Sequence, residues 1–142
     1  MKTIQQLIEN KGAGVWSVDP KDSVYDALSL MAEKEVGALM VLSGEKPVGI
    51  ISERDYARKV ILAGRASKDT SVEEIMSTRV VCTGPKHTIE ECMALMTDKR
   101  VRHLPVIDHR KLVGMISIGD LVKAIIDEQQ FIIEQLEHYI TS

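Results

Sequence analysis

The chain carries the stretch VGIISERD at residues 48–55 and repeats it as VGMISIGD at residues 113–120. Each copy is an apolar segment that passes through a glycine to a serine, with an aspartate three residues further on. A serine at this place can cap a following helix, because its hydroxyl accepts a hydrogen bond from an unpaired backbone N–H. An aspartate in the first turn is favoured by the helix dipole. Each copy therefore predicts a strand that leads directly into a helix.

The sequence around the two motifs repeats with one spacing. Pro20 aligns with Pro85, and 85 − 20 gives a shift of 65 residues that holds without a gap through both motifs. Ser23 and Thr88 each precede an apolar helical stripe and are predicted to cap it. Each half is thus predicted to hold a strand, a helix, two strands and a closing helix. Neither half is long enough to stabilise itself well, so we expect the two to pack their sheets together.

The fold class that follows is α+β (α/β-like): two tandem β-α-β-β-α repeats with pseudo-twofold symmetry and a helix added at each end. We divide the chain into an N-terminal helix and linker at residues 1–14, a first repeat at 15–70, a second repeat at 71–128 and a C-terminal helical extension at 129–142.

Three local predictions concern packing. Trp16 is expected to fill a core, as a single aromatic residue in a strand usually does. Cys82 and Cys92 are ten positions apart and match no C-x-x-C pattern, so we expect two small buried thiols and no metal or redox site. The helix after the first motif is expected to run from Asp55 to about Ala63.

The closing helix of the second repeat continues beyond its counterpart in the first. Its apolar face extends from Leu121 to Ile140. This face either packs back on its own domain or forms a contact between subunits, because an apolar helix without a partner in the repeat needs a surface to cover it. Both interpretations stay open at this point.

Composition excludes several classes of function. The 142 residues carry a formal net charge of −3, and basic residues are not interleaved with aromatic ones, so no nucleic-acid partner is expected. No apolar run approaches the ~20 residues that cross a bilayer. The N-terminus lacks the apolar core of a signal peptide. We therefore expect a cytoplasmic protein without a membrane partner.

No catalytic constellation is visible in the sequence. It offers no nucleophile–base pair, no metal-ligand spacing and no Walker-type glycine-rich loop. The four histidines have no sequence context that suggests catalysis. We expect the protein not to be an enzyme.

The sequence resembles a tandem pair of CBS domains, the module named after cystathionine beta-synthase. The resemblance rests on the β-α-β-β-α order in each half and on a Gly-h-h-Ser-x-x-Asp motif in both, where h is apolar. The run at residues 102–108 is similar to those in such repeats, and residues 72–76 look like the lead-in to a second repeat. The likeness covers the chain from Val15 to Ile126.

This resemblance implies an intramolecular pair with two clefts between the repeats, where many members bind AMP, ATP, NAD or S-adenosylmethionine. In those members the motif Asp holds the two ribose hydroxyls, the motif Ser or Thr lies near ribose or phosphate, and basic residues meet phosphates. Carried onto this chain, the ribose and phosphate candidates are Ser52, Asp55, Arg102, His103, Ser117 and Asp120. The adenine and ribose pockets would be lined by Ser17, Val18, Gly37, Ala38, Cys82 and Thr83.

The chemistry of these residue types fits those roles. A carboxylate offers two oxygens to the two O–H donors of a cis-diol, and a helix N-terminus offers N–H groups to phosphate. The arginine and histidine at 102–103 add donors. A structural interpretation stands beside each role: Asp55 and Asp120 as first-turn charges, and the arginine as a solvated charge. Arg54 and Arg58 point either at a phosphate or into water.

The two halves differ where the ligand would lie. The second has Arg-His at 102–103 where the first has Gly-Ala at 37–38, and the first has Glu-Arg at 53–54 where the second has Ile-Gly at 118–119. The two clefts should therefore differ in charge and size.

The expected function is an adenine-nucleotide-binding regulatory module, with AMP or NAD as the preferred ligand, that signals through a conformational change in a homodimer. The alternative is an interaction module that binds no small molecule and acts by assembly alone. In either case the regulated target is an unidentified effector protein or the protein's own assembly.

Overall fold

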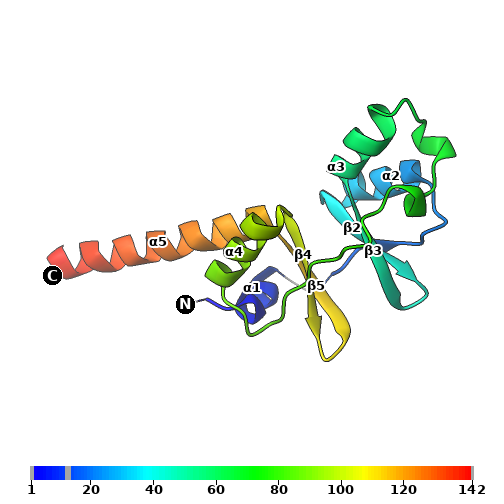
Figure 1. Cartoon of the computed structure of the whole chain (residues 1–142). Coiled ribbons are helices and arrows are strands. Elements are labelled where there is room, and N and C mark those ends of the chain that lie inside the picture. The colour runs from blue at the N-terminus through cyan, green and yellow to red at the C-terminus, as the bar shows by residue number, and fades with distance from the viewer. Residues whose placement is uncertain (1, 12–13, 142) are drawn as a thin grey trace. The chain divides into compact units, whose positions relative to one another are not determined.

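A computed structural model describes residues 2–11 and 14–141, which fall into two compact units (Figure 1). Residues 15–80 form the first-repeat unit. The second-repeat unit consists of residues 81 onward together with the segment that precedes residue 15. Each unit has its own hydrophobic core and is described by itself.

The first-repeat unit is built on a three-stranded sheet of order β1-β2-β3, in which β1 is parallel to β2 and β2 is antiparallel to β3. Its elements, in chain order, are β1 (Ser17–Val18), α2 (Val24–Lys34), β2 (Ala38–Ser43), β3 (Lys46–Ser52), α3 (Glu53–Tyr56), a π-helical turn (Ala57–Ile61) and two 3₁₀ turns (Ser67–Asp69 and Val72–Glu74).

The second-repeat unit repeats this arrangement around an antiparallel pair of strands, β4 and β5. Thr83 takes the place of β1, because it forms a parallel bridge with Val106 of β4. The helices and strands of the unit are α1 (Ile4–Lys11), α4 (Ile89–Lys99), β4 (His103–Asp108), β5 (Lys111–Ser117) and α5 (Ile118–Thr141). The predicted α+β fold with a β-α-β-β-α repeat is confirmed.

The internal repeat is visible in the backbone as well as in the sequence. Helices α2 and α4 both end at a residue with positive φ, Glu35 and Arg100, with φ values of 55° and 56°. Each strand pair has a register shift at the same place. The two cores share six pairs of buried residues at the 65-residue shift: Val24/Ile89, Ala27/Cys92, Met31/Met96, Leu39/Leu104, Val41/Val106 and Ile51/Ile116.

Each core is completed by a segment that the sequence analysis placed outside its repeat. Ile4 and Leu7 of α1 are buried in the second-repeat core, and Val72 and Ile75 occupy the matching places in the first-repeat core. These pairs are related by a shift of 68 residues, since 72 − 4 and 75 − 7 both give 68. By its packing, the first unit therefore extends to residue 80, beyond the sequence boundary at residue 70.

Backbone hydrogen bonds fix both segments in the same way. The Ile4 N–H donates to the His87 carbonyl at 2.9 Å, and the Val72 N–H donates to the Asp22 carbonyl at 2.8 Å. Asp22 and His87 are equivalent at the 65-residue shift. Residues 3–11 precede the first repeat but pack on the second, and residues 71–77 precede the second repeat but pack on the first. We call these two stretches the exchanged segments. Neither core is complete without its exchanged segment.

Three local expectations are corrected. Trp16 does not fill a core, because it is 43% exposed and the Lys34 ammonium lies 4.3 Å from its ring centroid. Cys92 is buried as expected, whereas Cys82 is exposed. The helix after the first motif begins at Glu53 and continues from residue 57 as a π-helical turn.

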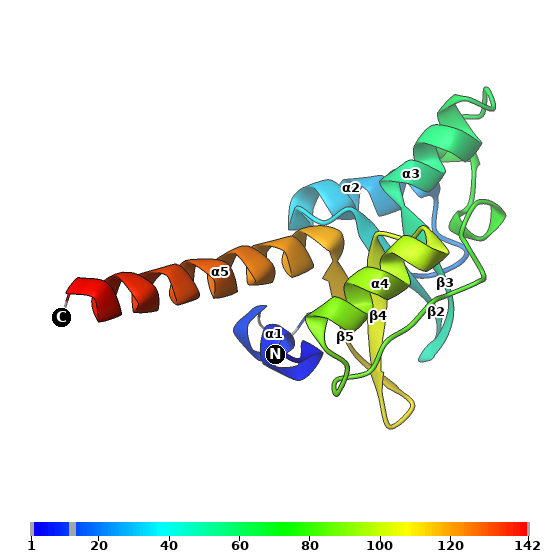
Figure 2. The ribbon, with the colours of Figure 1, turned by 60° about the vertical axis from the view of Figure 1, so that its left-hand side comes forward.

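Helix α5 extends well beyond the other elements of its unit (Figures 1 and 2). Leu121 and Ala124 at its beginning are buried, whereas Ile126, Leu136 and Ile140 are 60%, 57% and 79% exposed. Within the described part of the chain, no helix combines the length and apolar character needed to cross a membrane.

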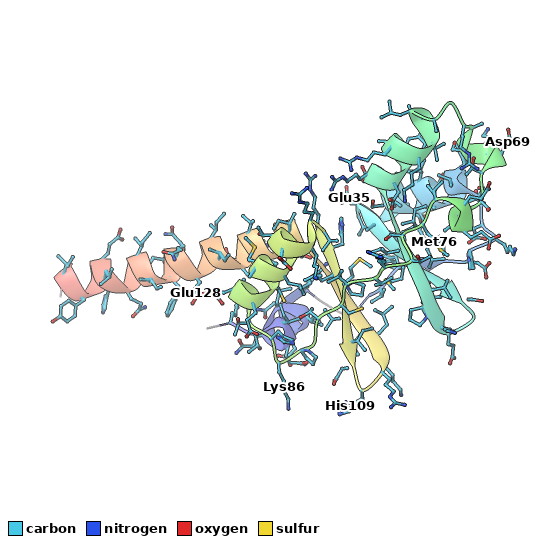
Figure 3. The ribbon with its side chains drawn as sticks, in the orientation of Figure 1. Glu35, Asp69, Met76, Lys86, His109 and Glu128 are labelled. Carbon is cyan, nitrogen blue, oxygen red and sulfur yellow. The ribbon has the colours of Figure 1, made fainter. Side chains whose placement is uncertain are left out.

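The motif glycines lie where the exchanged segments cross the sheets. A Cβ atom added to Gly49 would lie 2.7 Å from the Met76 sulfur and 2.9 Å from the Ser77 carbonyl oxygen (Met76 is labelled in Figure 3). At Gly114 the nearest atom would be the terminal methyl of Ile8, at 3.0 Å. Met76 and Ile8 are again 68 residues apart.

We predict that Gly49→Ala lowers the free energy of unfolding by about 1–3 kcal/mol, because the new methyl meets a backbone carbonyl that has little room to move. Gly114→Ala is the matched control and should cost less, because the end of a flexible Ile side chain can rotate away. Chemical denaturation of both variants measures the difference. An equal loss in the two variants would contradict this explanation of the motif glycine.

Candidate functional site

In both units the motif serine and aspartate form a reciprocal cap at the junction of a strand and a helix. The Ser52 N–H donates to Asp55 Oδ2 at 3.0 Å, and the Asp55 N–H donates to Ser52 Oγ at 3.2 Å. The matching distances for Ser117 and Asp120 are 2.8 and 3.1 Å. The predicted strand-to-helix turn is therefore present twice, and it holds each aspartate in the first turn of its helix.

The sheet register brings the neighbouring candidates beside these caps. Ala38 pairs with Ser52, and His103 pairs with Ser117. The carbonyls just before these strands accept hydrogen bonds from the first helical residues, at 3.1 Å for Gly37 and 2.9 Å for Arg102. Residues 37–38 thus lie next to the first cap, and residues 102–103 lie next to the second.

Not every candidate presents a side chain to a ligand. Val18 is part of the first-repeat core. Thr83 is 7% exposed, and its hydroxyl lies 3.2 Å from the buried Cys92 sulfur. At these two positions the side chain is therefore not presented to a ligand. Ser17 and Cys82, the preceding residues in the two repeats, are exposed.

The candidate arginines all lie at the surface. Arg54 and Arg58 are exposed on the helical segment that follows the first cap, and Arg102 is exposed directly before β4. Their guanidinium groups are therefore accessible to an anionic ligand, as both interpretations of these residues require.

The second cap contains a residue that the sequence analysis missed. Lys11, the last residue of α1, places its Nζ 2.7 Å from Asp120 Oδ2 and 2.8 Å from the Met115 carbonyl oxygen. In the first unit, Lys59 Nζ lies 3.3 Å from Asp55 Oδ1. The sequence carries no signal for the Lys11 contact beyond a cation at the end of a predicted helix, because that helix was placed outside the repeat.

Charges near the second cap shift the ionisation of two groups. Burial lowers the pKa of His103, and the nearby Lys11 ammonium and Arg102 guanidinium lower it further, against the opposing effect of Asp120. His103 is therefore neutral at pH 7. Burial acts to raise the pKa of Asp120, but hydrogen bonds from Lys11 and Ser117 outweigh it and hold the pKa below its ordinary value. Asp120 is ionised at neutral pH.

The two sites therefore offer different chemistry on the same scaffold. The second combines an ionised carboxylate with an ammonium, a guanidinium and a neutral imidazole, while the first has Gly37 and Ala38 in place of the two basic residues. Among the described residues, no three His, Cys, Asp or Glu side chains are grouped so that they could hold a metal ion.

Comparison with known proteins gives one consistent result. The family model described as CBS domain matches residues 13–61 and 72–127. The mitochondrial CBS domain-containing protein CBSX3 of Arabidopsis thaliana is 42% identical over 97% of this chain and 71% of its own length. The structure of a protein with CBS domains from Burkholderia ambifaria MC40-6, assigned to signal transduction, is 52% identical, with a TM-score of 0.87 over 90% of this chain and 96% of that one.

A more distant structure has the same fold. The CBS domain pair of protein MJ0100, solved in complex with 5′-methylthioadenosine and S-adenosyl-L-methionine, is 19% identical, with a TM-score of 0.77 over 89% of this chain and 98% of that one. The resemblance found in the sequence is thus confirmed by the family match, by a close relative and by the fold: the chain belongs to the CBS-domain family and carries two CBS domains.

Proposed function

We propose that this CBS pair is a regulatory module that binds adenine nucleotides, with AMP or NAD as its ligand, and has no catalytic activity of its own. The observation that carries the proposal is the duplicated cap, which fixes a carboxylate at a strand-to-helix turn in each repeat. A fixed carboxylate is suited to the cis-diol of a ribose. The complex of MJ0100 with two adenosine compounds supports this ligand class.

The surroundings of the second cap favour a phosphorylated ligand there. Arg102 supplies a permanent charge, and a guanidinium binds phosphate with two parallel N–H donors. His103 is neutral near pH 7, so it contributes a hydrogen bond rather than a charge. The first cap has Gly37 and Ala38 at the equivalent positions, so it offers neither a charge nor a large side chain there.

A second function is favoured by the same caps. Each aspartate already accepts hydrogen bonds from its own turn and lies close to a lysine, so both residues have a structural role without any ligand. The chain would then be an interaction module that acts by assembly alone. A melting-temperature screen separates the two functions, because a ligand at 100 times its Kd adds ~2.7 kcal/mol of stability.

Assembly has a candidate surface on α5, which we call the outer stripe. Its members are large side chains that are 44–82% exposed and lie on one face of the helix at spacings of three, four or seven residues: Ile126, Ile132, Ile133, Leu136, Tyr139 and Ile140. Taking roughly 150–250 Å² for a large side chain, the stripe exposes on the order of 550–900 Å². Two copies facing each other with the stripe fully covered would bury roughly 1,100–1,800 Å², which is enough for a specific interface. The proposed partner is therefore a second copy of this chain, and the signal would pass to an effector through that homodimer.

The ligand prediction separates the two ends of a nucleotide. Asp120→Ala should weaken adenosine and AMP equally, by at least roughly tenfold, because each hydrogen bond to a charged group contributes about 1.5–3 kcal/mol. Arg102→Ala should weaken AMP and leave adenosine nearly unchanged, and its effect should shrink as salt is raised. Calorimetric titration of both ligands against both variants measures this.

Two variants serve as controls for that experiment. Asp120→Asn keeps an oxygen for the cap, so it tests the ribose contact without removing the turn. Asp55→Asn reports the other repeat, and if it alone abolished binding, the occupied site would be the first. Wild-type affinity in Asp120→Ala, or no shift in melting temperature with any adenine compound at millimolar concentration, would refute the proposed site.

The assembly prediction concerns the outer stripe. Leu136→Glu should convert a dimer to a monomer at tens of micromolar, because it places two charges in an apolar contact. Glu134→Lys on the opposite face of α5 is the control and should leave the mass unchanged. Light scattering measures both masses. A monomeric wild type would rule out this interface.

A further inference from the structure

The two motif aspartates lie close to lysines of different origin. Asp55 is paired with Lys59, four residues further along the same helical segment. The position equivalent to Lys59 in the second repeat is Ala124, since 59 + 65 gives 124. Asp120 instead receives Lys11, which is 109 residues away in the sequence. The second repeat thus lacks the local lysine and takes its cation from α1.

Lys11 reaches Asp120 because the exchanged segments end differently in the two units. In the first unit the segment leaves its helical turn before Ser77, whose N–H donates to the Ile50 carbonyl at 2.9 Å. In the second unit α1 stays helical as far as Lys11. Met115 is equivalent to Ile50, and its carbonyl accepts from the Lys11 ammonium at 2.8 Å. One ammonium therefore replaces a backbone donor and also binds the motif carboxylate.

This contact occupies one of the two carboxylate oxygens that a ribose cis-diol would use. Asp120 Oδ2 accepts hydrogen bonds from Lys11 Nζ and from the Ser117 N–H. The Ser117 bond belongs to the cap and is needed to begin α5. Lys11 comes from another segment, and its side chain is 39% exposed. Exposed ion pairs contribute little to stability, so Lys11 can exchange for an incoming hydroxyl at low cost.

We propose that Lys11 is an internal competitor for the Asp120 carboxylate, and that a nucleoside entering the second repeat displaces it and frees the last turn of α1. The proposal rests on the proposed function, because it needs a ribose at Asp120. The remainder of α1 stays in place, since Ile4 and Leu7 are buried and the Ile4 and Gln5 N–H groups are bonded to the chain before α4. Occupancy of the second repeat is thus reported at the end of α1. In the first repeat Lys59 stays on the helical segment of Asp55 and donates to the Ile75 carbonyl at 2.8 Å, so the lysine itself is not part of the segment that completes the core.

The test measures adenosine affinity for the full chain in an Asp55→Asn background, so that only the second repeat is followed. Lys11→Met, which keeps the aliphatic stem, should bind adenosine about three- to fivefold more tightly, because the competitor is gone. Lys11→Arg keeps a cation, so its Kd for adenosine should remain within about twofold of the parent's. Lys86→Met removes an exposed lysine of the same unit and should change nothing (Lys86 is labelled in Figure 3).

Amide hydrogen exchange supplies an independent readout. Saturating adenosine should speed exchange at residues 8–11 in the parent protein, while Lys11→Met should exchange quickly there with or without ligand. Unchanged or weaker adenosine binding in Lys11→Met would overturn the proposal, as would unaltered exchange in the parent. A selective loss of AMP affinity would instead make Lys11 a phosphate ligand, which also contradicts it.

Failure of the proposed function has a different signature. In that case no adenine compound would bind the wild type or Lys11→Met with both motif aspartates intact, and the competition proposal would fall with it. Binding that is present but insensitive to Lys11 would refute only the competition.

Discussion

Burial of two apolar side chains from outside each repeat is the interaction on which both cores depend. Ile4 and Leu7 are 0% and 6% exposed in one unit, and Val72 and Ile75 are 0% and 1% exposed in the other. Fully burying a side chain of this size contributes about 1.5–3 kcal/mol, which is a large part of the stability of a small unit. Each exchanged segment therefore covers the sheet of the repeat that it does not directly precede in the chain.

The same exchange explains why the motif contains a glycine. The covering segment crosses the strand at Gly49 in one unit and at Gly114 in the other, and side-chain atoms of Met76 and Ile8 occupy the space that a Cβ would need. Three residues later the strand ends in the capping serine. Packing of the exchanged segment thus requires the glycine, and capping of the helix requires the serine. The cap then holds the aspartate in the first turn of that helix.

Much of this was predictable from the sequence, because the 65-residue shift carries the strands, the helices and both caps. The packing of the exchanged segments was not predictable, because they are related by a shift of 68 residues rather than 65. The pair Ile4 and Val72 that reveals this shift consists of residue types that are common in any core. A weak signal existed: Thr3 with Gln6 and Ser71 with Glu74 both form capping pairs. The exposure of Trp16 and the Lys11 contact depend on tertiary packing, which periodicity does not encode.

The two sites share the cap that holds the aspartate and differ in the lysine that lies beside it. Both fix a carboxylate by the same two backbone hydrogen bonds, so both have the same geometry for a diol. They differ in the cation beside it. Lys59 lies on the same helical segment as Asp55 and bonds the Ile75 carbonyl, whereas Lys11 lies on α1 and bonds Asp120 and the Met115 carbonyl. Both sites are thus connected to the segment that completes their core, but in opposite directions. In the first the lysine belongs to the helix of the aspartate, and in the second it belongs to α1, because Ala124 replaces the local lysine and α1 extends to Lys11.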